Sequence, residues 1–348
     1  MSLRFGLIGY GLFGRHHARA IAQAPGATLA AIACRSRETA EAARKDYPDA
    51  AVELDYRALL ARRNIDAVDI VVPNDLHEEI GVAALEAGKD VLLEKPLAPT
   101  LAACDRLIET ARRTGRVLSI GHELRLSEQW GAIKRLIDAG DLGDLRCVVF
   151  DLFRFPYRPG SGGWRHDPRR IGSWIMEELV HHFDLVLWYF ERWGDPVAVS
   201  AVGFSRGGDP ALTEVLTATL RFHGGRYAVV TLTLTGFEYH LGCEVIGAEG
   251  ALRAWWSGGM DRTREADFGL KVQRRGASAP VTVPFVVSGE LFELEEQLRL
   301  AVGAFRERRA LVTAEEARKS VAVCLAVEEA LREGRPKGTA LFIRPRHP

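Results

Sequence analysis

Short apolar runs alternate with amphipathic segments along the N-terminal third of the chain. The apolar runs have the length of strands and lie at residues 4–9, 27–34, 67–73, 90–96 and 117–121. The segments between them carry apolar residues at helical spacing, at residues 14–25, 37–47, 75–89 and 102–115. Strands that alternate with helices of this length are typical of a parallel sheet with helices on its faces. We therefore expect an α/β domain with a doubly wound parallel sheet.

The pattern changes after Gly121. A helix is expected at residues 127–140, a strand at 145–155, a Gly- and Pro-rich loop at 156–172 and one helix from Ser173 to Phe190. β-branched runs separated by Gly- and Asp-rich breaks follow between residues 197 and 287 and favour a largely antiparallel sheet. Amphipathic helices are expected at 290–308 and 313–334. We therefore expect a second domain of the α+β class, with the domains at 1–122 and 123–348.

Composition and charge narrow the functional classes. The 348 residues are 47% hydrophobic, which is enough for two buried cores. The formal net charge is zero, so no global basicity attracts nucleic acid. No apolar run reaches the roughly 18 residues of a membrane-spanning helix, and the N-terminus does not resemble a signal peptide. The five cysteines include no CxxC pair. We therefore expect a cytoplasmic protein without a metal site.

The first apolar run ends in the pattern Gly9-x-Gly11-x-x-Gly14, with Leu12 and Phe13 between the last two glycines. Between a strand and a helix, this pattern is typical of a dinucleotide-binding turn. Gly9 permits the tight turn, Gly11 lets a pyrophosphate approach the backbone, and Gly14 allows close packing of helix on strand. The start of the helix then offers N–H groups to the phosphates. The alternative is a glycine turn in another kind of α/β protein.

The end of the second predicted strand bears on the choice of cofactor. Sites that prefer NAD usually place an acid here to bind the adenosine ribose hydroxyls. This chain instead has Cys34, Arg35, Ser36 and Arg37. Two guanidinium groups and a hydroxyl suit a 2′-phosphate, so we expect NADP, with NAD as the alternative. The competing interpretation is that Arg35 and Arg37 are solvated charges at the start of a helix.

The fourth predicted strand ends in Glu94-Lys95-Pro96. Ligands of an open parallel sheet bind beyond the carboxyl ends of its strands. A charged pair at this point is therefore expected beside the cofactor. Pro96 restricts the backbone and so helps to aim the side chain of Lys95.

Several motifs, in this order, resemble those of the Gfo/Idh/MocA family of oxidoreductases. They are the glycine pattern, VVPNDLHEEIGVAALEAGKDVLLEKPLA, GWRHDP and EELVHHFD. The resemblance covers essentially the whole chain. It implies a Rossmann domain followed by a domain with an open, mostly antiparallel sheet. It also implies an NAD(P)-dependent interconversion of an alcohol and a carbonyl, usually on a sugar, a cyclitol or a derivative, in a homodimer or homotetramer.

The resemblance assigns roles to individual residues. Lys95 matches the family lysine near the nicotinamide and the reacting oxygen, and Glu94 matches the acid that contacts the cofactor ribose. The chain also matches two further family features. One is a turn beside the cofactor, and the other is a pair of loop residues that reaches the cofactor or the substrate. These further cofactor positions are Pro73, Asn74, His77, Trp164 and Arg165.

The segment EELVHHFD holds two acid–histidine pairs, Glu177 with His181 and Glu178 with His182. Each pair is four residues apart, so within one α-helix each shares a face. The spacing alone does not separate them. The resemblance does, because His181 and Asp184 match the family's His-x-x-Asp and place Glu177 where Asp is usual. Glu178 and His182 are then expected to face elsewhere.

The predicted catalytic residues are Lys95, His181 and Glu177. The imidazole of His181 would take the hydroxyl proton, since histidine titrates near neutral pH. Glu177 would orient that imidazole or bind a substrate hydroxyl, and Lys95 would stabilise negative charge on the oxygen or relay the proton. The cofactor would accept or give the hydride.

Two other functions stay open. Some members of the family keep the fold but serve as NAD(P)-binding sensors without catalysis. The presence of both Lys95 and His181 argues against this, because a sensor needs neither. The third reading is a lyase-like enzyme that oxidises its substrate transiently with a tightly held cofactor.

Overall fold

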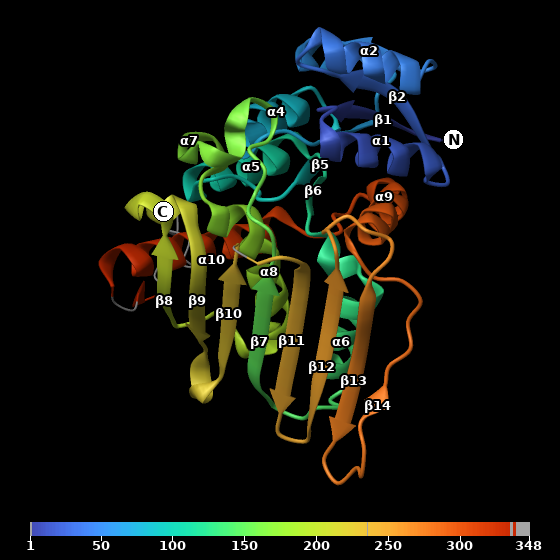
Figure 1. Ribbon diagram of the computed structural model, residues 1–348. Coiled ribbons are helices and arrows are strands. Elements are labelled where there is room, and N and C mark those ends of the chain that lie inside the picture. The colour runs from blue at the N-terminus through green and yellow to red at the C-terminus, as the bar shows by residue number, and fades with distance from the viewer. Residues whose placement is uncertain (1, 235, 335–336, 339–348) are drawn as a thin grey trace. The chain divides into compact units, whose positions relative to one another are not determined.

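The computed structural model describes residues 2–234, 236–334 and 337–338, which form two compact units (Figure 1). The first unit comprises Met1–Glu123, Arg169–Ile171 and Leu294–Val321. The second comprises Leu124–Pro168, Gly172–Glu293 and the described residues from Ala322 onward. Part of the C-terminal region joins the first unit because Leu298, Val302 and Phe305 belong to its hydrophobic core. The division into domains at residue 122 stays a prediction.

The first unit is built on a parallel sheet of six strands among the described residues, in the order β3-β2-β1-β4-β5-β6. Each neighbouring pair of strands is parallel. The predicted doubly wound parallel sheet is confirmed. The strands are β1 (Leu3–Ile8), β2 (Ala27–Ala33), β3 (Ala51–Glu53), β4 (Ala67–Ile70), β5 (Asp90–Glu94) and β6 (Leu118–Gly121). The sequence interpretation missed β3, because its three half-buried residues form no apolar run.

Helices connect these strands, and local chemistry sets their ends. They are α1 (Leu12–Gln23), α2 (Arg37–Asp46), α3 (Tyr56–Leu60), α4 (His77–Glu86) and α5 (Leu101–Thr114). The side-chain oxygens of Ser36 and Thr100 accept backbone N–H groups and so cap α2 and α5. Gly115 closes α5 at a φ of 64°, in the left-handed region that favours glycine.

The order of strands reverses at β1, which lies between β2 and β4. Doubly wound sheets bind their ligands at such a reversal, beyond the carboxyl ends of the strands. Here the carboxyl ends of β1, β4 and β5 lead into Gly9, Val71 and Lys95. The glycine turn and the charged pair Glu94-Lys95 therefore lie on one edge of the sheet.

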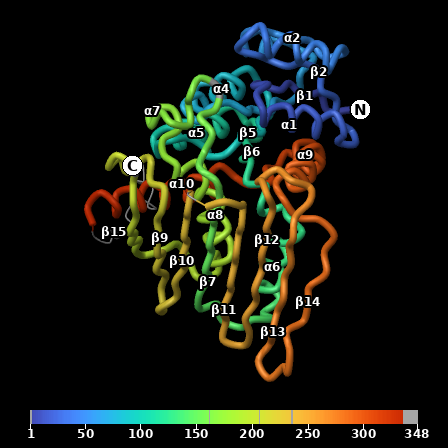
Figure 2. Tube along the Cα trace, viewed as in Figure 1, coloured from blue at the N-terminus to red at the C-terminus, as the bar shows by residue number. Residues whose placement is uncertain are grey.

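The second unit is built on a sheet of nine strands in the described part of the chain, in the order β14-β13-β12-β11-β7-β10-β9-β8-β15. Neighbours are antiparallel except β7 and β10, so the mostly antiparallel open sheet is confirmed. Figure 2 shows the chain through this sheet as a tube. The strands are β7 (Leu145–Phe153), β8 (Ala198–Ser205), β9 (Thr213–Arg221), β10 (Tyr227–Thr233), β11 (Tyr239–Gly247), β12 (Gly250–Gly258), β13 (Asp267–Arg274), β14 (Val281–Thr282) and β15 (Lys337–Gly338).

One face of this sheet packs on helices α6 (Glu128–Asp138) and α8 (Val180–Tyr189), which lie along it in Figure 1. Phe150 of β7 is fully buried at the centre. Its ring lies 6.1 Å from that of Trp130 and 6.3 Å from that of Tyr189, measured between centroids. Strand alternation thus points one side of β7 at an aromatic core.

The helix expected from about Ser173 to Phe190 is present, but it is not α-helical throughout. Ile175–Leu179 form a π-helical turn, and the α-helix α8 begins only at Val180. A π turn bonds residues five apart, so four residues no longer complete a turn there. Equal spacing in Glu177/His181 and Glu178/His182 therefore does not put each pair on one face. Both Glu177 and Glu178 are buried.

The C-terminal region contributes α9 (Glu290–Arg306) and α10 (Ala314–Glu333). In the part of the chain that the structure describes, no helix is long and apolar enough to cross a membrane. Shorter turns complete the fold: η1 (Asn74–Leu76), η2 (Glu123–Leu126), η3 (Ser161–His166), α7 (Pro168–Ile171), η5 (Glu191–Trp193), η6 (Arg206–Gly208), η7 (Pro210–Leu212) and η8 (His223–Gly225).

The first turn of α9 buries the carboxyl group of Glu293. The Gly289 N–H donates to Oε1 over 3.3 Å, and Oε2 has no hydrogen-bond partner among the described residues. Burial raises the pKa of Glu293 to about 7, because the nearby Ser127 and Gly289 donors offset only part of the desolvation. A glutamate of ordinary pKa 4.5 in the unfolded chain binds its proton less tightly. Between these values the folded protein holds more protons, so stability falls as pH rises.

We expect Glu293→Gln to remove this pH dependence. The variant should unfold at a higher temperature than the wild type at about pH 8, by an amount worth on the order of 1–3 kcal/mol, and at nearly the same temperature at about pH 4.5. Thermal unfolding followed by circular dichroism over this range measures the effect. Glu296→Gln, at a partly exposed residue of the same helix that pairs with Arg299, is the control. Parallel pH profiles for wild type and Glu293→Gln would contradict the assignment.

Candidate functional site

The glycine turn after β1 is shaped by two steric limits. Gly9 has a φ of 105°, and a Cβ there would lie 2.1 Å from the Val71 carbonyl oxygen. A Cβ on Gly14 would lie 2.1 Å from the Gly9 carbonyl oxygen. Neither position accepts a side chain, which agrees with the tight turn and the close helix packing expected of them.

Gly11 differs, because a Cβ there would meet no atom within 4 Å. It is the N-cap of α1, no side chain caps that helix, and its first turn contains no acid. The first N–H groups of the helix are thus available to an anion, and the positive end of the helix dipole favours one. Leu12 is 74% exposed beside them. The turn fits a dinucleotide pyrophosphate, for which the missing side chain at Gly11 leaves room.

Arg35, Ser36 and Arg37 are all exposed after β2. In the described part of the chain, neither guanidinium forms an ion pair. The Ser36 hydroxyl accepts the Thr39 N–H over 3.2 Å and caps α2, a role that the sequence interpretation did not assign. The segment therefore offers two uncompensated positive charges at the place where a 2′-phosphate would bind.

Glu94 ends β5 in a buried cluster of three titratable groups. His17 of α1 donates from Nδ1 to Asp69 Oδ2 over 2.8 Å, and its Nε2 lies 3.4 Å from Glu94 Oε1. His17 and Asp69 are 0% exposed and Glu94 is 5% exposed. Burial alone would lower the pKa of His17, but the two carboxylates outweigh it and raise the pKa to about 10. The cluster thus holds an imidazolium between two acids at neutral pH.

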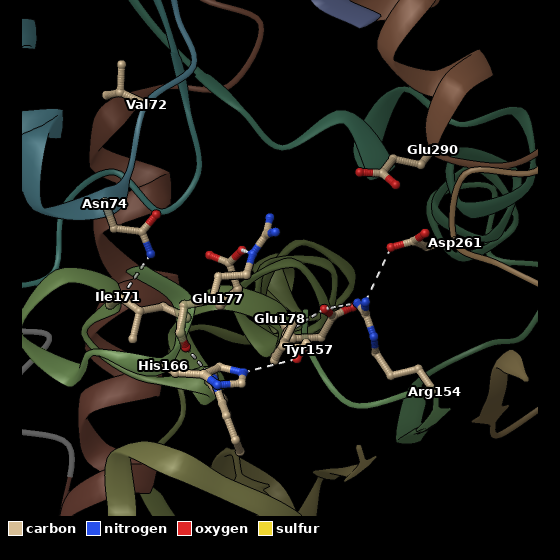
Figure 3. A network of polar contacts seen from close by, with 12 residues as sticks. Val72, Asn74, Arg154, Tyr157, His166, Ile171, Glu177, Glu178, Asp261 and Glu290 are labelled. Atoms are coloured by element: carbon tan, nitrogen blue, oxygen red, sulfur yellow. Dashed lines mark hydrogen bonds and ion pairs between the residues drawn. The ribbon is translucent and has the colours of Figure 1, made fainter. Parts of the chain in front are cut away.

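The predicted turn residues Pro73, Asn74 and His77 follow β4 at the same edge of the parallel sheet, and hydrogen bonds hold the side chains of Asn74 and His77 there. His77 is fully buried, and its ring nitrogens lie 2.7 Å from the Pro96 carbonyl oxygen and 3.0 Å from that of Val72. Asn74 Nδ2 donates to the Ile171 carbonyl over 2.9 Å (Figure 3). Pro73 is the N-cap of the turn η1. His77 therefore connects the turn at Pro73-Asn74-Asp75 to Pro96, the residue after Lys95.

In the second unit, three predicted residues come together. Arg165 Nε donates to Glu177 Oε1 over 3.1 Å, and the Arg165 guanidinium lies 4.9 Å from the centre of the Trp164 ring. Glu177 is buried, whereas Arg165 is partly exposed. The contact with a guanidinium holds a buried carboxylate in one orientation. The sequence interpretation named all three residues but not this contact.

Glu178 lies in a separate polar cluster, as Figure 3 shows. Its Oε2 accepts from Arg154 Nη1 and from the Tyr157 hydroxyl over 2.6 Å, and its Oε1 accepts from the Tyr239 hydroxyl over 3.2 Å. Arg154 also contacts Asp261 over 3.3 Å. Burial and the Glu178 charge raise the pKa of both tyrosines well above the ordinary value, so both stay hydroxyl donors. The expectation that Glu178 faces away from Glu177 is consistent with these separate partners.

Asp184 forms a bidentate ion pair with Arg125, at 2.6 and 2.8 Å, and both side chains are buried. Arg125 also lies 5.5 Å from the centre of the Trp188 ring. Asp184 therefore anchors α8 to the segment before α6. No group of three or more His, Cys, Asp or Glu side chains in the described residues could hold a metal ion.

The main functional residue to which the sequence analysis assigns no role is His17. A signal was present in Asp69, an acid within the apolar run AVDIVV. A charged side chain in a buried strand requires a partner, and His17 supplies it.

The chain is similar in sequence to known proteins along most of its length. Residues 3–122 match the model of an oxidoreductase family with an NAD-binding Rossmann fold (GFO_IDH_MocA), and residues 130–253 match the GFO/IDH/MocA C-terminal domain. An inositol 2-dehydrogenase/D-chiro-inositol 3-dehydrogenase of Halalkalibacterium halodurans is 31% identical over 254 residues, 72% of this chain and 71% of that protein. The chain belongs to the Gfo/Idh/MocA family of oxidoreductases.

Other members of the Gfo/Idh/MocA family match over a similar or greater length. An inositol 2-dehydrogenase of Corynebacterium glutamicum is 28% identical over 270 residues, 77% of this chain and 78% of that protein. The crystal structure of an aldose-aldose oxidoreductase from Caulobacter crescentus has the same fold, with a TM-score of 0.82 at 23% identity over 97% of this chain and 100% of that one. The protein is therefore an enzyme, an oxidoreductase that uses a nicotinamide cofactor. The roles of individual residues stay predictions.

We expect Gly11→Ala to leave the fold intact and to weaken binding of the dinucleotide. The new methyl group meets no atom of the protein within 4 Å, but it occupies the space that a pyrophosphate needs. Cofactor affinity should fall by roughly 10-fold or more, with an unchanged melting temperature. Gly303→Ala, in α9 with nothing within 4 Å, is the matched control. Unchanged affinity in Gly11→Ala would show that the turn does not hold the pyrophosphate.

Proposed function

We propose that the protein interconverts a secondary alcohol and a carbonyl on a sugar, a cyclitol or a related polyol, with transfer of a hydride to or from NAD(P). The inositol dehydrogenases among its relatives support this substrate class. The observation that carries the proposal is the position of Lys95, which follows β5 on the sheet edge that also carries the glycine turn. A cation there is suited to a developing alkoxide.

The chemistry divides between cofactor and protein. When bound, the nicotinamide supplies the acceptor or donor of the hydride. In the oxidative direction the substrate carbon loses its C–H electron pair with that hydride, and the O–H bond breaks to leave a carbonyl. A ring nitrogen of His181 takes the hydroxyl proton, and the Lys95 ammonium stabilises negative charge on the oxygen. In reduction the same groups return the proton.

Glu177 positions rather than reacts. Its carboxylate already accepts from Arg165, which fixes its orientation, and it can also accept a substrate hydroxyl or the imidazole N–H. Trp164 lies under the Arg165 guanidinium, which restricts the motion of that side chain. Among the predicted cofactor contacts, Glu94 would accept the ribose hydroxyls, while Pro73, Asn74 and His77 shape the turn beside them.

We further propose that NADP is preferred over NAD. The exposed Arg35 and Arg37 support this, because no acid opposes a 2′-phosphate at the end of β2. We also propose a homodimer or homotetramer in the cytoplasm, with no nucleic acid or membrane as partner. The five free, buried cysteines are in keeping with a reducing compartment.

Lys95→Met tests the catalytic assignment. We expect kcat for oxidation of the best substrate in a panel of cyclitols and sugars to fall roughly 100-fold or more, with a smaller change in affinity for the cofactor. His181→Gln should behave similarly and also lose the dependence of rate on pH near neutrality. Absorbance of the reduced cofactor follows the reaction. Lys45→Met, an exposed lysine of α2, is the control. A Lys95→Met enzyme that turns over like the wild type would sink the mechanism.

Replacing both Arg35 and Arg37 with Ala tests the cofactor preference. The KM for NADP should rise by roughly 10- to 100-fold, while the KM for NAD should change by less than about threefold, because only NADP carries the 2′-phosphate. Arg44→Ala, another exposed arginine of α2, is the control. An equal effect on both cofactors would show that these arginines do not bind the 2′-phosphate.

A further inference from the structure

Three elements of the first unit meet at His17. The residue lies on α1 behind the glycine turn, Asp69 lies in the middle of β4, and Glu94 is the last residue of β5. The ring of Phe13 packs edge-on against the His17 ring, with 4.7 Å between the centroids. The histidine thus touches the glycine turn, the neighbouring strand and the residue before Lys95.

The cluster contains more negatively than positively charged groups. Burial raises the pKa of Asp69 most, the His17 charge and hydrogen bond oppose this, and the nearby Glu94 charge adds to the rise. One imidazolium between two carboxylates leaves a net charge of −1, and that charge is shielded from water. Without the imidazolium, two buried acids would remain in this cluster with no cation beside them, which is costly in the protein interior.

The space around Glu94 is fixed on its other side as well. A Cβ on Gly121 of β6 would lie 2.7 Å from Glu94 Oε1, so the glycine leaves just enough room for this carboxylate. Beyond Lys95, the Pro96 carbonyl oxygen lies 2.7 Å from the buried His77 ring. Lys95 therefore lies between two fixed neighbours. The carboxylate of Glu94 pairs with His17, and the carbonyl oxygen of Pro96 contacts the His77 ring.

We propose that His17 is a positioning residue of the enzyme: its positive charge holds the Glu94 carboxylate in place as an acceptor for the cofactor ribose, and so fixes the start of the Glu94-Lys95 segment. The proposal rests on the proposed role of Glu94 at the cofactor. It assigns His17 an electrostatic task, not only a packing one. Asp69 acts on the other side of the ring, where it holds the Nδ1 proton and the ring orientation.

The test compares His17→Gln with the double variant His17→Gln/Asp69→Asn. The single variant removes the cation and leaves two facing acids. The double variant also removes one acid and restores the net charge of −1 with Glu94 as its sole carrier. We expect the dissociation constant for NADP, measured by quenching of tryptophan fluorescence, to rise roughly 10- to 100-fold in the single variant. The double variant should recover at least about 10-fold of this loss.

His16→Gln is the matched control, because it makes the same substitution one residue earlier in α1 and should bind NADP like the wild type. A folded His17→Gln protein that binds NADP as the wild type does would overturn the proposal. So would a double variant no better than the single one, since a packing role alone predicts additive damage.

A second measurement covers the case in which the variants do not fold. NMR of the wild type labelled with ¹³C and ¹⁵N at histidine reports the charge of the His17 ring without any cofactor. We expect the imidazolium signature to persist above neutral pH, in keeping with the raised pKa of about 10. A neutral His17 ring at about pH 7.5 would overturn the proposal. Failure of the wild type to bind NADP or NAD would instead overturn the proposed function, and the two failures are distinct.

Discussion

One buried cation between two buried carboxylates connects the motifs of the N-terminal unit. A carboxylate in the apolar strand β4 is costly unless it is paired, and His17 pairs it across 2.8 Å. The same ring faces Glu94, the residue before the predicted catalytic lysine. Because α1 begins at the glycine turn, the position of this ring also fixes how that helix lies against β4 and β5. Cofactor turn, strand ends and Lys95 are therefore parts of one electrostatic arrangement.

In the second unit, two buried acids within one helical turn also require positively charged partners. Glu177 and Glu178 are adjacent, buried and alike in charge, so each requires its own partner. Arg165 pairs with Glu177, and Arg154 with two tyrosines binds Glu178. The π turn at Ile175–Leu179 allows consecutive acids to reach separate clusters before α8 begins. π turns within α-helices are frequent at functional sites.

Much of the fold was predictable, because the periods of apolar residues report which faces are buried. The alternation of strands and helices gave the parallel sheet, and β-branched runs gave the antiparallel one. The three-residue strand β3 and the π turn left no such period. At the end of the region of β-branched runs, the strand β14 covers only Val281–Thr282; the Val283 N–H still donates to the Leu270 carbonyl, but Pro284 offers no N–H to continue the ladder.

The site was predictable only in part. Motifs named the glycine turn, Lys95, Glu177 and Arg165, because they mark single positions along the chain. They did not reveal pairings between distant residues: His17 and Asp69 are 52 positions apart, and Arg125 and Asp184 are 59 apart. Such contacts arise from the topology of the strands. The four-residue spacing of the pairs Glu177/His181 and Glu178/His182 suggested a shared face for each pair. It does not give one, because the helix changes from π to α between the members of each pair.

The most direct test of the enzyme's reaction is isotopic. Cyclitols and aldoses deuterated at their ring carbons are incubated with the protein and NADP in ordinary water, and the reduced cofactor is examined by mass spectrometry. Direct hydride transfer predicts that the reduced nicotinamide carries deuterium from the substrate carbon. Reduced cofactor without deuterium, or no reduction by any member of the panel, would contradict the account.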